Sequence, residues 1–164
     1  MNKENLLKLS EFLMENKLPF TMEHYRANIV SDESDQYYVA RIFTLDELDK
    51  GLESCGTAGC ALGWSPFVIP PSEKAKVDGT YGLGGLDLGL YTEETFGILS
   101  PEEESSVFDY DWTFVDDSRQ GAAFRLAQLA NHGIVYESDV DVTESYFKAR
   151  DQWVVQWEQA NENK

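Results

Sequence analysis

The stretch DSRQGAAFRLAQLANHG, residues 117–133, carries the clearest helix signal in the chain. It opens on polar residues, continues through apolar residues at helical spacing, and ends at Gly133, a residue type that commonly closes helices. Those apolar residues are Ala122, Ala123, Phe124, Leu126, Ala127, Leu129 and Ala130. A long, continuous pattern of this kind predicts a central helix and favours a mainly α fold.

Helical patterns also occur toward both ends of the sequence. Residues 5–16 place Leu6, Leu9, Phe12 and Leu13 on one face, and Pro19 prevents continuation. Residues 143–160 carry a bulky apolar stripe, which we interpret as core packing. The stripe consists of Tyr146, Phe147, Trp153, Val154 and Trp157.

The middle of the chain contains shorter signals. A capping-box pattern at Thr44 predicts a helix to about Ser54. Thr57 is expected to cap a second, apolar helix that runs through Trp64 and stops before Pro70. Residues 72–90 are glycine-rich, and we expect them to form a loop. Further helix starts are predicted at Thr92 and at Ser100, which Pro101 follows. Residues 37–43 are the best strand candidate, with no obvious partner strand. We therefore expect a mainly α, compact single domain over residues 1–164, with at most a short β element near residues 37–43.

The charge is strongly negative. The 164 residues include 30 Asp or Glu against 13 Lys or Arg, for a net charge of −17, while 42% are hydrophobic and 13% aromatic. This composition predicts a folded protein with an acidic surface rather than a disordered chain. Such a surface repels nucleic acid and anionic membranes but attracts basic protein surfaces. Duplex DNA carries one charge per about 1.7 Å, so the net charge corresponds to about ten base pairs.

The acidity is concentrated in residues 77–118, which hold eleven acidic residues and no Lys or Arg. Its densest part mixes acids with the aromatic residues Phe108, Tyr110, Trp112 and Phe114. Buried aromatic anchors surrounded by steering charges are typical of protein-binding surfaces. The alternative, which the sequence leaves open, is that the aromatics face the core and only the carboxylates face water. The candidate partner-binding residues are Glu102, Glu103, Glu104, Phe108, Asp109, Tyr110, Asp111, Trp112, Asp116 and Asp117.

Catalytic and metal-binding patterns find little support. Cys55 and Cys60 lack the spacing of a redox pair and, with His24 and His132, match no zinc-finger pattern. The glycine run of residues 81–89 lacks the order of a phosphate-binding loop. No nucleophile or zinc-protease motif is present. We expect no enzymatic activity, no cofactor and no metal.

A resemblance adds a possible origin. The segment CGTAGCALGW, residues 55–64, resembles a signature of small uncharacterised phage and bacterial proteins, Cys-Gly-Thr-x-x-Cys-x-x-Gly followed by Trp or His. The pieces at residues 20–25 and 97–108 are similar to segments that accompany this signature. The resemblance implies a phage origin and carries no activity with it.

Together these observations predict a small acidic phage-type protein that binds and inhibits a host nucleic-acid-binding or defence protein, with DNA mimicry as the proposed means. Two alternatives stay open: a metal- or nucleotide-dependent enzyme centred on residues 55–60, and a phage protein whose acidity serves solubility alone. The expected partner is a basic host protein, not nucleic acid or membrane. The sequence begins with no secretory signal and has no membrane-length apolar run, so we expect a cytoplasmic location.

Overall fold

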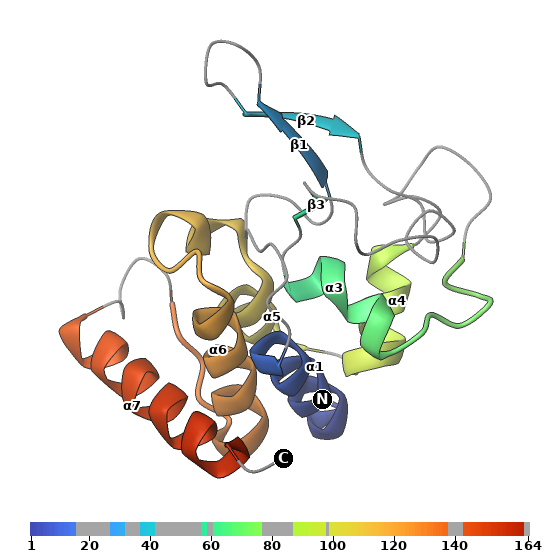
Figure 1. The fold of residues 1–164 in the computed structure, drawn as a ribbon. Helices are drawn as coiled ribbons and strands as arrows, with labels where there is room; N and C mark the ends of the chain where they lie inside the picture. The colour runs from blue at the N-terminus through green and yellow to red at the C-terminus, as the bar shows by residue number, and fades with distance from the viewer. Residues whose placement is uncertain are drawn as a thin grey trace.

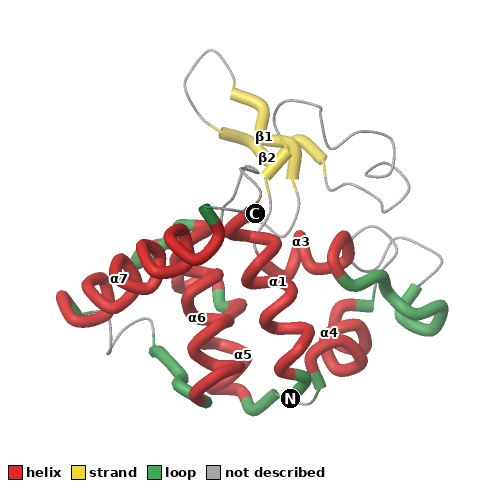
Figure 2. Tube along the Cα trace, turned by 60° about the horizontal axis from the view of Figure 1, so that its bottom comes forward, coloured by secondary structure: helices red, strands yellow, loops and turns green. Residues whose placement is uncertain are grey.

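The computed structural model describes residues 1–15, 27–31, 37–41, 57–58, 61–76, 87–97, 99–137 and 143–162. Within these ranges the chain is mainly helical, which confirms the predicted fold class. Figures 1 and 2 show the helices gathered in one body, with α1 and α6 at its centre and the strands at one end.

The core is built around two packed helices, α1 (Lys3–Glu15) and α6 (Arg119–His132). Leu6, Leu9 and Leu13 of α1 are fully buried, as their spacing predicts. Nearly every residue of α6 from Gly121 to Ala130 is buried as well. Its many small side chains allow other elements to approach closely from several sides, which explains why this stretch occupies the centre.

Three shorter helices complete the body, and their ends follow local chemistry. Helix α3 (Ala61–Val68) contains Pro66, whose missing N–H leaves the Leu62 carbonyl without its helical donor; the Ser65 hydroxyl donates to that oxygen at 2.7 Å. Helix α4 (Leu88–Phe96) is capped by Asp87 and begins four residues before the expected start at Thr92. Helix α5 (Pro101–Phe108) begins with the predicted capping box at Ser100.

Helix α7 (Glu144–Asn161) packs on α6 and lies at the edge of the body (Figure 1). Tyr146 is its one fully buried residue within the described part. Phe147 and Trp153 pack against the core while half-buried, and Val154 and Trp157 are also half-buried. The predicted apolar stripe therefore exists, but most of it is covered on one side only.

The β structure is more extensive than the single element that we expected. Strand β2 (Tyr37–Arg41) pairs antiparallel with β1 (Ala27–Ser31), and β1 also pairs antiparallel with β3 (Thr57–Ala58), giving the order β2-β1-β3. Sequence reasoning missed the partners because β1 and β3 are short and lack alternating polarity. The helix expected from Thr57 begins only at Ala61, and the helix predicted for residues 44–54 lies outside the described residues.

Candidate functional site

The predicted partner-binding residues divide between the surface and the core. Glu102, Glu104, Asp111 and Asp117 are exposed, and we call these four carboxylates the acidic surface. Glu103 and Asp109 are half-buried, and the side chain of Tyr110 lies outside the described residues. The short 3-10 helix η1 (Tyr110–Phe114) follows α5 closely, so in the sequence these four carboxylates extend from the first turn of α5 to the residue before the N-cap of α6.

Local hydrogen bonds explain how the acids of α5 are placed. Ser100 and Glu103 form a reciprocal cap: the Glu103 N–H donates to Ser100 Oγ at 3.2 Å, and the Ser100 N–H donates to Glu103 Oε2 at 2.8 Å. A hydrogen bond from its own backbone N–H, with a second from Ser100, lowers the pKa of Glu102. Carboxylates are favoured here because the first turn of a helix presents unpaired N–H groups and positive partial charge.

Asp109 connects α5 to η1. Its Oδ2 accepts a hydrogen bond from the Ser105 hydroxyl at 2.6 Å, and its Oδ1 accepts the Asp111 N–H at 3.0 Å. Both carboxylate oxygens therefore accept hydrogen bonds within the turn between α5 and η1, which leaves Asp109 less able to bind a partner than the sequence suggested.

Three predicted contact residues are buried and cannot reach a partner's surface. Phe108 and Trp112 belong to the hydrophobic core, where Phe108 packs on Phe96 and Trp112 stacks on Tyr146. Asp116 is 5% exposed. Both rings face the core, so the alternative left open by the sequence holds at Phe108 and Trp112.

Phe114 has the opposite environment and is the residue that sequence reasoning left out of the site. It is 75% exposed, the highest value among the large hydrophobic side chains of the described part. It lies in sequence between Asp111 and Asp117 of the acidic surface. The sequence shows where acids and aromatics mix but not which aromatic faces outward; in the structure Phe114 does.

Asp116 is the centre of a buried polar network. Its Oδ2 accepts the Tyr146 hydroxyl at 2.8 Å, and its Oδ1 accepts Ser118 Oγ at 2.5 Å and Arg150 Nη1 at 3.0 Å. Arg125 Nη1 lies 3.7 Å from Oδ2 and donates to the Tyr146 oxygen at 2.9 Å. One carboxylate thus joins the segment after η1 to both α6 and α7.

Burial sets the protonation behaviour of this network. Arg125 is 0% exposed, and its guanidinium lies 3.8 Å from the centre of the Trp112 ring, a cation–π arrangement. Burial lowers the pKa of Arg125 and raises that of Tyr146. For Arg150, burial opposes the charge, but hydrogen bonds to Asp151 and Asp116 outweigh it and raise the pKa.

Gly121 provides the space that Asp116 occupies. A β-carbon at this position would lie 2.0 Å from Asp116 Oδ2, far inside contact distance. The carboxylate therefore packs against the first turn of α6, where the Gly121 N–H donates to Ser118 Oγ at 2.9 Å. No sequence pattern indicated this pairing, since glycine inside a helix otherwise reads as a weak position.

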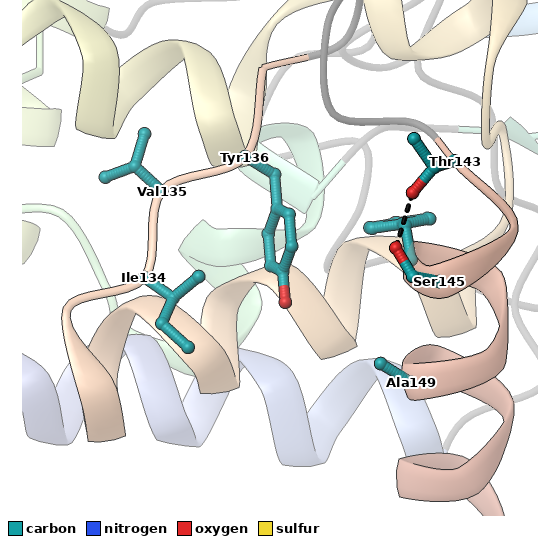
Figure 3. A pocket seen from close by; sticks show the side chains of 7 residues that line it. Ile134, Val135, Tyr136, Thr143, Ser145 and Ala149 are labelled. Atoms are coloured by element: carbon teal, nitrogen blue, oxygen red, sulfur yellow. Dashed lines mark hydrogen bonds between the residues drawn. The ribbon is translucent and has the colours of Figure 1, made fainter.

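A pocket of about 350 Å³ lies between the segment after α6 and the first turns of α7. Figure 3 shows the Tyr136 ring extending into this space and the hydroxyls of Thr143 and Ser145 facing each other across from it. It is lined by Ile134, Val135, Tyr136, Thr143, Ser145, Tyr146 and Ala149. Among the described residues, this lining offers hydroxyls and apolar surface and no charged side chain.

Most of the cysteine and histidine residues that were weighed as a redox or metal site lie outside the described residues. His24, Cys55 and Cys60 are not among the described residues, and His132 is exposed at the end of α6. Within the described ranges no group of three or more Asp, Glu, His or Cys is placed to hold a metal ion. Among the helices of these same ranges, none is long and apolar enough to span a membrane.

Comparisons with known proteins add no relative: no protein family, curated protein or solved structure matches the chain. The resemblance to small phage proteins therefore stays a prediction.

Proposed function

We propose that this protein binds a basic protein surface through the acidic surface and the exposed Phe114, without catalysing a reaction. The observation that carries the proposal is one large apolar side chain, 75% exposed, in a segment that holds the four exposed carboxylates of the acidic surface and, over residues 102–118, no Lys or Arg. An aromatic anchor with charges of one sign around it supplies both the contact area and the steering that a charged partner needs.

The partner's expected chemistry follows from the charge. Exposed carboxylates favour Arg and Lys, and Arg in particular combines carboxylate pairing with stacking on an aromatic ring. Surfaces that bind nucleic acids are rich in these residues. We therefore propose a nucleic-acid-binding protein as the partner, with a host defence protein of a phage as the specific case and competition with DNA as the means of inhibition.

The affinity for a basic partner should depend on the salt concentration. Charges that are exposed interact over about 8 Å at physiological ionic strength. Binding to a basic partner should therefore weaken steeply as salt rises, whereas a purely apolar contact through Phe114 would change little.

Titration with poly-L-arginine at low and high salt tests the proposal. We expect binding at low salt that weakens as salt is added, and displacement of poly-L-arginine from duplex DNA by the protein. Absence of binding at low salt, or binding that ignores salt, would contradict the proposal.

A further inference from the structure

We infer that the Asp116 network is a positioning device that holds residues 109–118 in a preformed shape, so that Phe114 and the neighbouring carboxylates are presented ready to bind. The inference rests on the proposed function. It assigns a binding role to Tyr146 and Arg150, two residues of α7 that belong to a different part of the chain from the acidic surface.

The segment is anchored before Phe114. Trp112 is fully buried, and its indole N–H donates to the Ser105 carbonyl of α5 at 3.0 Å. The Arg125 guanidinium lies 3.8 Å from the centre of its ring, and the centre of the Tyr146 ring lies 5.7 Å from it. Two residues before the exposed aromatic, the chain is therefore fixed to α5, α6 and α7.

The segment is anchored again after Phe114. The backbone N–H of Asp116 donates to the Trp112 carbonyl at 2.9 Å, and its side chain accepts from Tyr146, Arg150 and Ser118. Phe114 thus lies between two buried anchors, each two residues away.

The same hydroxyl contributes to both anchors. Tyr146 donates to Asp116 and accepts from Arg125, whose guanidinium covers Trp112. A segment held in this way loses little conformational freedom on binding, which leaves more of the contact energy for affinity. Loosening the network should weaken binding even though none of its members touches the partner.

Tyr146→Phe tests this inference, with Tyr91→Phe as a matched control. Both changes remove one buried hydroxyl; the Tyr91 hydroxyl donates to the Ile69 carbonyl at 2.9 Å, among residues of α3 and α4. We expect Tyr146→Phe to weaken poly-L-arginine binding between about twofold and tenfold, mainly through faster dissociation. Amide hydrogen exchange in residues 109–118 should also speed up. Tyr91→Phe should leave both measurements as in the unmodified protein.

Arg150→Gln is a second variant, for which two accounts predict opposite changes in the affinity for poly-L-arginine. It removes a positive charge, so a purely electrostatic account predicts tighter binding to poly-L-arginine. The positioning account predicts weaker binding, because Asp116 loses its contact at 3.0 Å.

Measuring Phe114→Ala as well distinguishes a failure of the positioning inference from a failure of the proposed function. If Phe114→Ala weakens binding but Tyr146→Phe and Arg150→Gln do not, the positioning inference is wrong and the proposed function stands. If none of the three changes binding, the proposed function is wrong and the inference falls with it.

Discussion

The acidic surface and the Asp116 network contain the same chemical group in opposite surroundings. Glu102, Glu104, Asp111 and Asp117 are exposed to water, whereas Asp116 is buried among Tyr146, Arg150, Arg125 and Ser118. Exposed carboxylates are available to a partner and contribute little to stability. The buried carboxylate is fully used within the fold, and removing it would leave the buried Arg125 guanidinium without its carboxylate. Adjacent acids in one sequence can therefore have unrelated roles.

The largest expected effect comes from removing the buried acid. Asp116→Ala should lower the free energy of unfolding by about 3–5 kcal/mol, because it leaves Arg125 buried without its carboxylate. Asp111→Ala, at an exposed Asp of the same segment, should change it by less than about 0.5 kcal/mol. Urea unfolding of both variants measures the contrast. Similar small losses of unfolding free energy at the two positions would contradict the contrast between the buried and the exposed carboxylate.

The next effect concerns the space beside Asp116. Gly121→Ala should cost about 1–3 kcal/mol, since the new methyl group would overlap the carboxylate. Gly89→Ala in α4 is the control, because the nearest described atom to a β-carbon there is Asp87 Oδ1, at 3.6 Å. Alanine should be neutral or stabilising by up to about 1 kcal/mol at that position. A stabilised Gly121→Ala protein, measured by thermal unfolding, would show that Asp116 does not occupy this space.

Removing the Tyr146 hydroxyl should have an intermediate effect that depends on pH. At neutral pH, Tyr146→Phe should cost about 1–2 kcal/mol, through lost hydrogen bonds to Asp116 and Arg125. Burial raises the pKa of Tyr146 above its ordinary value of 10.0. The stabilising contribution of the hydroxyl is therefore complete below about pH 10 and is lost above it, as the unfolded chain ionises first.

The free energy of unfolding, measured at a series of pH values, checks the direction of this pH dependence. Above pH 10 the advantage of the unmodified protein over Tyr146→Phe should shrink by about 1.4 kcal/mol per pH unit. An advantage that stays constant or grows over that range would show that the hydroxyl is not held neutral by the fold.

The smallest expected effect on stability is at Phe114. Because its ring is 75% exposed, Phe114→Ala should change the free energy of unfolding by less than about 0.5 kcal/mol. Phe108→Ala, in the core, is the reference for a buried aromatic and should cost more. A large loss at Phe114 would indicate that its ring supports the fold rather than a partner.

Local signals in the sequence predicted much of the helical framework. The α6 pattern, the leucines of α1 and the capping box at Ser100 are all present, because each depends on residues within a few positions of one another. The strand pairing of β1 with β2 and β3 depends on contacts between separate segments, which no periodicity shows. The sequence also indicated where acids and aromatics mix, but the side facing water is set by packing on α6 and α7. The Asp116 network was missed for the same reason.

The most direct test of the account compares two charge-neutralised proteins. One carries Glu102→Gln, Glu104→Gln, Asp111→Asn and Asp117→Asn; the other changes the exposed Glu11, Glu15, Glu158 and Glu162 to Gln, on α1 and at the end of α7. Both lose four negative charges, so a general charge effect is equal in the two. The account predicts that the first protein binds poly-L-arginine at least about tenfold more weakly than the second at low salt. Equal affinities would contradict it, because they would show that the acidity acts as a whole and not through the surface around Phe114.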